Sequence, residues 1–232
     1  IMLISVIIPV YNEEKTIDKI LNKILSLKDL DIEIIIVNDG STDQTVSVLK
    51  NFESYEFIKF VDHKFNLGKG AAIQSAKKFI KGDITIIQDA DLEYNPSDYV
   101  KLIEPIINKK VSVVYGSRVL GKARYKNKSF TSKFRVFANH ILTIISNILN
   151  SQNLTDAHTC YKVFETKLFN SINLVENGFN FCPEITTKIS KKKVKIVEVP
   201  ISYFGRSYKE GKKIKLSDGI DAIYTLFKHR FF

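Results

Sequence analysis

The sequence has 232 residues, of which 44% are hydrophobic and 26% charged, and its formal net charge is +10. These values are ordinary for a globular protein with one sizeable core. Cys160 and Cys182 form neither a disulfide framework nor a Cys-x-x-Cys motif and indicate reduced thiols in a cytosolic protein. No apolar run reaches the roughly 18 residues of a membrane span, and residues 2–10 lack the basic start and cleavage site of a signal peptide.

The positive charge is concentrated in the second half of the chain. Residues 1–108 contain 12 Lys and Arg against 17 Asp and Glu, whereas residues 109–232 contain 23 against 8. Nine of these basic residues, and no acid, lie between Lys109 and Arg135. We therefore expect the second half to face something anionic, such as phosphates, a lipid surface or nucleic acid.

Strand and helix patterns alternate through the first half. Apolar, β-branched runs predict strands at residues 3–9, 32–37, 57–61, 84–88 and 111–115. Helical spacing of apolar residues predicts helices at residues 17–25, 70–80 and 97–107, and another after the polar turn at residues 38–43. This alternation, with its short connections, predicts an α/β fold in which helices cover both faces of a mostly parallel sheet.

The second half is predicted to be mainly helical. Residues 134–149 carry apolar side chains at helical spacing, and Arg135 and Asn139, four residues apart, share the opposite face. Two further helical stretches and a strand at residues 194–199 follow. The amphipathic segment 217–232 is expected either to pack on the sheet or to lie in a membrane interface. Because no repeat or low-complexity linker interrupts the chain, we expect a single domain spanning residues 1–232.

Three predicted loops place acidic side chains just past the ends of strands. Glu13 follows the first strand, Asp39 the second, and Asp89 and Asp91 the fourth. Ligands of open α/β sheets bind at the carboxyl ends of the strands. Each loop alone could merely cap the helix that follows it, but together the three loops indicate a cleft.

The acids after the fourth predicted strand suit a hard divalent cation. Mg²⁺ and Mn²⁺ take oxygen ligands, usually one or two carboxylates together with phosphate oxygens of a substrate. Asp89 and Asp91 fit this arrangement, and Glu93 is a third candidate ligand. A solvated acidic turn is the alternative for an isolated Asp-x-Asp. The histidines are scattered, and we assign none of them to a metal.

Several short motifs carry a resemblance to a known family. They are Pro9-Val10-Tyr11-Asn12-Glu13, Asn38-Asp39-Gly40-Ser41, Gly68-Lys69-Gly70, Asp89-Ala90-Asp91 and Gly116-Ser117-Arg118. With these motifs in this order, the chain resembles glycosyltransferase family 2 over essentially its whole length. It is similar in particular to the dolichyl-phosphate mannosyltransferase and bactoprenyl-phosphate glycosyltransferase branch. The resemblance implies a GT-A fold, a nucleotide-sugar donor, a divalent metal and inversion at the anomeric carbon.

The resemblance also implies a division of labour along the chain, with nucleotide-sugar binding in residues 1–120 and a membrane-facing acceptor half in residues 121–232. Its nucleoside contacts correspond to Tyr11, Glu13 and Asp39. Carboxylates suit these places because they accept hydrogen bonds from ribose hydroxyls or a base N–H. The base pocket of the family corresponds here to Pro9 and Val37.

The donor diphosphate is expected next to the paired aspartates. By the resemblance, Asp89, Ala90 and Asp91 contact the donor, and the two aspartates hold the metal. Breaking the sugar–phosphate bond leaves extra negative charge on the nucleoside diphosphate, which a metal and nearby cations stabilise. Lys69 and Arg118 are the candidate cations.

At two positions the sequence departs from common forms of the family. Asn38 replaces the first acid of the Asp-Asp-Gly-Ser form. Glu93 stands where mannosyltransferases of this branch often carry Gln.

The acceptor side is predicted from the second half. Asp156 matches the family's acceptor-side aspartate, as a base or as an acceptor-orienting group. A hydroxyl acceptor must lose a proton to a base, whereas a lipid phosphate is already anionic and needs positioning and cations. The resemblance suggests a phosphate-binding set, with a mobile loop at residues 203–213 that closes over both substrates. The set consists of Arg118, Arg135, Asn139 and Arg206.

The leading hypothesis is transfer of a sugar from a UDP- or GDP-hexose, with a preference for UDP, to a dolichyl or undecaprenyl phosphate. The protein would act peripherally at the cytoplasmic face of the membrane. A second hypothesis keeps the donor site but uses a hydroxyl of a glycolipid or glycan. A nucleic-acid-binding protein would explain the basic half, but no aromatic-interleaved basic motif is present. A nucleotidyltransferase would leave the first and last of the motifs above unexplained.

Overall fold

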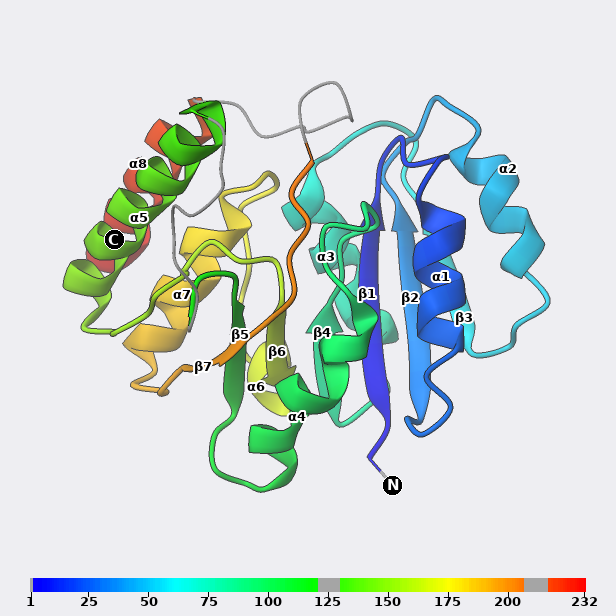
Figure 1. Cartoon of the computed structure of the whole chain (residues 1–232), viewed down its shortest axis with the longest axis horizontal. Coiled ribbons are helices and arrows are strands. Elements are labelled where there is room, and N and C mark those ends of the chain that lie inside the picture. The colour runs from blue at the N-terminus through cyan, green and yellow to red at the C-terminus, as the bar shows by residue number, and fades with distance from the viewer. Residues whose placement is uncertain (1, 121–129, 207–216) are drawn as a thin grey trace.

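The core of the molecule is a seven-stranded sheet with the order β3-β2-β1-β4-β6-β5-β7 (Figure 1). The computed structural model describes residues 2–120, 130–206 and 217–232, and within them the side chains of 130–135 and 217 are not described. The strands are β1 (Ile4–Val10), β2 (Ile32–Asn38), β3 (Ile58–Asp62), β4 (Ile84–Ile87), β5 (Val113–Ser117), β6 (Lys162–Glu165) and β7 (Val197–Pro200). Among the strands that the structure describes, only the pairs formed by β6 are antiparallel, which confirms the predicted mostly parallel sheet.

Helices cover both faces of this sheet, and in Figure 1 α1 lies in front of it and α3 behind it. The helices are α1 (Ile17–Leu25), α2 (Thr45–Leu49), α3 (Lys69–Ala76), α4 (Tyr99–Ile107), α5 (Phe130–Asn150), α6 (Thr166–Asn170), α7 (Phe181–Lys191) and α8 (Ser217–Phe231). Short 3₁₀ turns at Lys50–Phe52, Lys77–Phe79 and Pro96–Asp98 adjoin α2, α3 and α4. Because both faces are covered, all residues of β4 and all of β1 except the half-buried Pro9 are buried, with no alternation.

Strand β6 was not expected, since the sequence predicted only helices between residues 149 and 194. This strand is four residues long and begins with a lysine, so it carries too little apolar pattern to be recognised. It inserts antiparallel between β4 and β5. As a result, the loop that precedes it is carried to the same edge of the sheet as the acidic motif after β4.

Helix α8 packs chiefly on α7 and α5, so the expectation that it packs on the sheet is wrong. The two helices α5 and α8 lie side by side at the left of Figure 1. Within the described ranges, none of the helices combines the length and hydropathy required to cross a bilayer.

Candidate active site

The loops after β1 and β2 are joined by hydrogen bonds at the carboxyl edge of the sheet. The main-chain N–H of Asn12 donates to Ser41 Oγ at 3.0 Å, and the N–H of Thr42 donates to Asn12 Oδ1 at 2.8 Å. Pro9 and Val37, the expected walls of the base pocket, are register partners on adjacent strands. Tyr11, two residues after Pro9, is half-buried. The structure thus brings Pro9 and Val37 together and joins the loops that carry Tyr11, Glu13 and Asp39.

Asp39 is buried and organises the loop that leads into α3. Its carboxylate accepts hydrogen bonds from the main-chain N–H groups of Leu67, at 2.9 Å, and Gly68, at 2.8 Å. His63 Nδ1 lies 2.7 Å from Asp39 Oδ1, and its Nε2 lies 2.9 Å from Ser75 Oγ. Sequence reasoning missed His63, although its position one residue past β3, next to the end of β2, was a usable signal.

Asp89 pairs with Lys69, which lies in the Gly68-Lys69-Gly70 motif at the start of α3. Burial alone would raise the pKa of Asp89, but the Lys69 ammonium, together with Cys160 and Arg206, lowers it. Lys69 Nζ also lies 3.2 Å from Cys160 Sγ, a contact that the sequence did not indicate. The ion pair places a cation directly beside the candidate metal ligand.

Asp91 lies close to two other carboxylates. Burial, and then the carboxylates of Asp89 and Glu93, raise the pKa of Asp91 from 3.8 to about 7. Arg206 partly compensates this charge, because its Nη2 lies 2.9 Å from Asp91 Oδ2 while the same guanidinium pairs with Glu13 at 3.0 Å and 3.1 Å. A guanidinium therefore bridges the acids after β1 and β4.

Glu93 is directed to the segment at residues 203–206. Its carboxylate accepts hydrogen bonds from Tyr203 Oη and from the main-chain N–H of Arg206, both at 2.7 Å. No cluster of three or more metal-ligating side chains occurs among the residues that the structure describes. The role of Glu93 as a third ligand stays a prediction.

The residues at the end of β4 fit a divalent cation bound together with a phosphorylated substrate. Such a cation needs only one or two protein carboxylates when substrate phosphates complete its shell. Asp89 and Asp91 supply hard oxygen ligands, and the raised pKa of Asp91 reflects a local demand for positive charge. The observed partners of the two acids, Lys69 and Arg206, are themselves cations.

Arg118 and Asp156 form a buried ion pair on the other side of the site. Arg118 Nε and Nη2 lie 2.6 Å and 2.7 Å from the two carboxylate oxygens, and the Arg118 main-chain N–H donates to the same group at 3.1 Å. Burial would raise the pKa of Asp156, but the interactions with Arg118, together with the Lys162 ammonium, lower it. The Arg118 guanidinium also lies 5.1 Å from the centre of the Tyr203 ring.

Two further side chains form hydrogen bonds with the main chain of the loop that carries Asp156. Glu198, on β7, accepts hydrogen bonds from the main-chain N–H groups of Thr155 and Asp156 at 2.7 Å and 2.8 Å. Lys162 is fully buried and donates to the carbonyls of Ala157 and Thr159 at 3.1 Å and 2.6 Å. Sequence reasoning missed both. Glu198 could have been noticed as an acid within an apolar edge strand. No local feature of the sequence distinguished Lys162 from the other lysines.

The proposed phosphate-binding set is only partly visible. Arg118 forms an ion pair with Asp156, whereas Arg206 forms ion pairs with Glu13 and Asp91. Asn139 is half-buried on α5. The side chain of Arg135 and residues 207–213 of the predicted mobile loop lie outside the described part of the chain.

The glycine motif before α3 is packed against another loop rather than being a free turn. A Cβ on Gly70 would lie 2.0 Å from the Glu176 carbonyl oxygen, whereas a Cβ on Gly178 would meet nothing within 4 Å. We expect Gly70→Ala to lower the free energy of unfolding by about 1–3 kcal/mol, since an overpacked site must shift its backbone, and to weaken donor binding through Lys69. Urea unfolding and donor titration measure the two effects.

Gly178→Ala is the matched control for this prediction, and we expect it to leave both quantities unchanged. Equal behaviour of the two variants would show that the contact between Gly70 and the 176–177 backbone does not constrain the Lys69 loop.

His158, in the Asp156 loop, gives the protein a pH-dependent stability. Burial, and then the Lys162 ammonium, lower the pKa of His158 from 6.5 to about 4. The stability contributed by the neutral ring is complete above pH 6.5 and is lost as the pH falls toward 4. For this one group we expect a loss of at most about 2 kcal/mol between pH 8 and pH 5, measured by urea unfolding. His158→Gln should have a flatter profile over this range, and an unchanged slope would contradict the assignment.

The chain belongs to glycosyl transferase family 2, whose family model matches residues 5–172. The predicted family is therefore confirmed, and the protein is a glycosyltransferase. It is 31% identical to a UDP-N-acetylglucosamine–dolichyl-phosphate N-acetylglucosaminyltransferase of Methanococcus voltae, over 97% of this chain and 94% of that protein. It is 30% identical to a dolichyl-phosphate beta-glucosyltransferase of Trichomonas vaginalis, over 97% of this chain and 72% of that protein.

Solved structures support the fold at much lower sequence identity. Glucosyl-3-phosphoglycerate synthase of Mycobacterium tuberculosis, crystallised with Mn²⁺, UDP and phosphoglyceric acid, superposes with a TM-score of 0.70 at 18% identity, over 100% of this chain and 79% of that one. Mannosyl-3-phosphoglycerate synthase of Rubrobacter xylanophilus superposes with a TM-score of 0.73, also at 18% identity, over 98% of this chain and 72% of that one. The predicted GT-A fold is confirmed.

Proposed function

We propose that this protein transfers a hexose, with inversion and with Mg²⁺ or Mn²⁺, from a UDP- or GDP-linked donor to a polyprenyl phosphate. The names of its relatives support the acceptor, because those proteins are named as transferring glucose or N-acetylglucosamine to dolichyl phosphate. The donor nucleotide of one relative is named as UDP, and UDP is also present in a structural neighbour. Both observations favour UDP over GDP.

The observation that carries the choice of acceptor is the ion pair of Asp156. Both oxygens of this carboxylate are held by Arg118, and its pKa is lowered. A carboxylate in this state is a weak base, so it is poorly suited to remove a proton from a hydroxyl. A phosphate acceptor requires no such step, because it is already anionic and needs orientation and nearby cations. The pair therefore favours a lipid phosphate over a sugar hydroxyl.

The donor would lie across the carboxyl ends of β1, β2 and β4. Pro9 and Val37 would line the base pocket, with Tyr11, Glu13 and Asp39 around the ribose and base. Since Asp39 already holds the Leu67 and Gly68 amides, it would also fix the loop that carries Lys69.

The donor diphosphate would lie over Ala90, with Asp89 and Asp91 holding the metal. A bound Mg²⁺ or Mn²⁺ would stabilise the negative charge that develops on the leaving nucleoside diphosphate. Lys69 adds a fixed positive charge at the same place, preorganised by its ion pair with Asp89. Glu93 would hold the 203–206 segment and so keep Arg206 beside this diphosphate.

The acceptor phosphate would approach from the side of Arg118, with Arg135, Asn139 and Arg206 as further contacts. Arginine suits this task because its planar group of donors matches phosphate oxygens. Since the acceptor is a membrane lipid, residues 121–232 would face the bilayer, and the protein would act at the cytoplasmic membrane surface.

The test is a transfer assay with UDP- and GDP-hexoses, with Mn²⁺ or Mg²⁺, and with a short polyprenyl phosphate or its dephosphorylated alcohol in detergent. We expect transfer to the phosphate alone, with a product whose anomeric configuration, determined by NMR, is opposite to that of the donor. Transfer only to hydroxyl acceptors would overturn the proposal and would identify a glycolipid or glycan transferase.

A further inference from the structure

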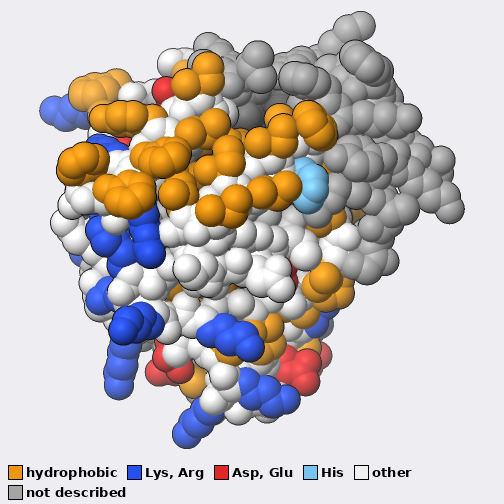
Figure 2. All heavy atoms as spheres, turned by 90° about the vertical axis from the view of Figure 1, so that its left-hand side faces the viewer, with side chains coloured by type: hydrophobic (Ala, Val, Ile, Leu, Met, Phe, Trp, Pro, Cys, Tyr) orange, Lys and Arg blue, Asp and Glu red, His pale blue; other side chains and the backbone are white. Residues whose placement is uncertain are grey.

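Helices α5 and α8 expose matching apolar stripes on one face of the molecule. On α5 the exposed residues are Phe137, Ile141, Ile144 and Ile148. On α8 they are Ile220, Tyr224, Phe227 and Phe231. Both sets follow the same i, i+4, i+7, i+11 spacing, which places each on one side of its helix. Figure 2 shows the hydrophobic side chains as a band across this face, with Lys and Arg side chains below it.

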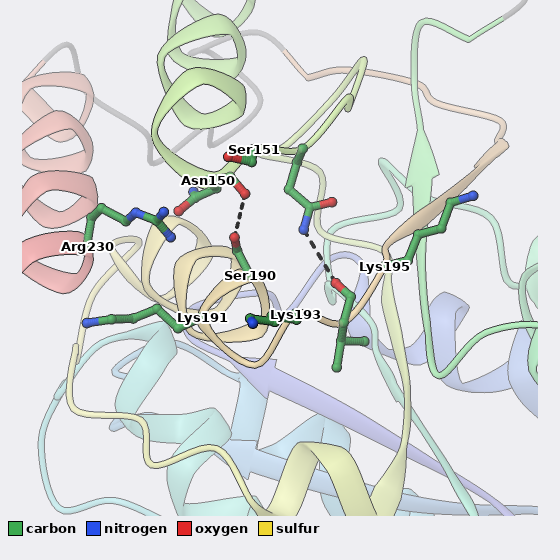
Figure 3. A pocket seen from close by; sticks show the side chains of 9 residues that line it. Asn150, Ser151, Ser190, Lys191, Lys193, Lys195 and Arg230 are labelled. Atoms are coloured by element: carbon green, nitrogen blue, oxygen red, sulfur yellow. Dashed lines mark hydrogen bonds between the residues drawn. The ribbon is translucent and has the colours of Figure 1, made fainter.

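A basic cavity of about 560 Å³ lies where α5, α7 and α8 end. Its nine lining residues include Lys191, Lys193, Lys195 and Arg230, and no acid. Figure 3 shows these side chains arriving from three parts of the chain, with Arg230 on α8, Lys191 and Lys193 at the end of α7, and Lys195 before β7. The cavity therefore concentrates positive charge contributed by separate elements.

Few protein groups neutralise this charge. Lys191 Nζ donates to the His229 carbonyl at 2.9 Å, as expected for a lysine at a helix end. In the described ranges, no acidic side chain forms an ion pair with Lys193, Lys195 or Arg230. Helix capping thus accounts for one of the four cations and leaves the others available to a ligand.

A second feature of the cavity also points to a ligand. Asn150, which lines it, is 1% exposed, and its amide group donates to Ser146 Oγ and Thr187 Oγ1. Its Oδ1 is buried and has no hydrogen-bond partner. A buried acceptor of this kind costs free energy unless a donor reaches it. A ligand that carries both a negative charge and a hydroxyl or ammonium donor would satisfy Asn150 and the basic residues together.

The cavity lies at one end of the two apolar stripes. Ile148 is in the last turn of α5, two residues before Asn150, and Phe231 is the last residue of α8, next to Arg230. A helix that lies in a membrane interface buries its apolar side at the boundary between headgroups and acyl chains, so its polar border lies among the headgroups. Basic residues at such a border attract anionic lipids. The charge of the cavity is thus complementary to the bilayer surface that the apolar face would meet.

We propose that the face formed by α5 and α8 docks on a bilayer and that the basic cavity at its border binds the headgroup of an anionic phospholipid. The headgroup phosphate pairs with Lys193, Lys195 and Arg230, and its hydroxyl or ammonium group donates to Asn150. This site lies at the C-terminal ends of α5 and α8, and its lining includes none of the residues assigned to sugar transfer. The headgroup site gives the protein a preference for membranes that contain anionic lipid. This inference rests on the proposed function only in that the protein meets a membrane.

The test is flotation of the protein with vesicles that contain no polyprenyl phosphate and no donor. We expect binding to phosphatidylcholine vesicles with 30% phosphatidylglycerol, and at least tenfold weaker binding to pure phosphatidylcholine. Because each basic residue near the surface contributes about fivefold to the affinity, Lys195→Gln/Arg230→Gln should weaken binding by about 25-fold. Tyr224→Glu should weaken it as well, since it puts a charge into the apolar face.

The matched control is Lys19→Gln/Lys23→Gln, which removes two exposed charges from α1 and should bind like the unmodified protein. Equal losses in both double variants would mean that net charge, and not the cavity, attracts the protein, and would overturn the proposal. If soluble glycerol phosphate occupied the cavity in the absence of vesicles and abolished vesicle binding when added to them, the cavity would be a site for a free phosphate. That result would also overturn the proposal. Transfer to a short acceptor in detergent should be unchanged in Lys195→Gln/Arg230→Gln, so failure of this inference and failure of the proposed function are distinguishable.

Discussion

Asp91→Ala should lower the rate of sugar transfer by at least about 10³-fold, the order expected when a group that stabilises leaving-group charge is removed. Asp91 would be one of the two carboxylates that hold the metal against the donor diphosphate. Burial and the neighbouring carboxylates of Asp89 and Glu93 disfavour its charged form and raise its pKa to about 7. Removing the carboxylate should therefore not destabilise the fold, and thermal unfolding should occur at the same temperature or higher.

The combination of lost transfer and retained stability is what distinguishes a functional carboxylate from a structural one. Transfer is measured at saturating Mn²⁺ and donor, with thermal unfolding of the same sample. Asp29→Asn, at an exposed position between α1 and β2, is the matched control and should change neither quantity. Near-normal transfer in Asp91→Ala would exclude the metal assignment.

Arg118→Ala should lower the free energy of unfolding by about 3–5 kcal/mol, because it leaves the buried Asp156 carboxylate without its partner. The side chains of Arg118 and Asp156 are only 15% and 5% exposed, so water cannot replace the lost guanidinium well. The substitution should also raise the KM for polyprenyl phosphate more than the KM for the donor. Urea unfolding and steady-state kinetics with each substrate varied measure these effects.

A double substitution separates the two roles of this pair. Arg118→Ala/Asp156→Ala removes both charges and should recover much of the stability lost in the single variant, whereas transfer should stay low because the acceptor phosphate still lacks its cation. If the double variant were no more stable than Arg118→Ala, the pair would not be a coupled buried ion pair. If the KM for both substrates rose equally, Arg118 would be structural rather than acceptor-binding.

The arrangement of Arg206 links the donor and acceptor sides of the site. Its guanidinium contacts Glu13 and Asp91, while Glu93 holds its main-chain N–H and the Tyr203 hydroxyl. Tyr203 in turn stacks beneath the Arg118 guanidinium. One short segment thus contacts the acids that would hold the donor and the arginine that would hold the acceptor.

Local sequence patterns were enough to predict the first half of this fold and the edge at which its site lies. Strands β1, β2 and β4 are β-branched runs buried on both faces, a local pattern that depends little on the rest of the chain. In a parallel sheet all carboxyl ends meet at one edge. The positions of Asp39, Asp89 and Asp91 just past strand ends were therefore enough to predict that their loops converge.

The pairing of charged groups could not be predicted from local sequence. Arg206 reaches Asp91 across 115 residues, and Arg118 pairs with Asp156 across 38, after the short strand β6 inserts between β4 and β5. The basic cavity and the face formed by α5 and α8 likewise depend on α8 packing on α5 and α7. Local propensity selects helix or strand but does not select partners, because ion pairs and helix contacts between distant residues are set by the packing of the whole core.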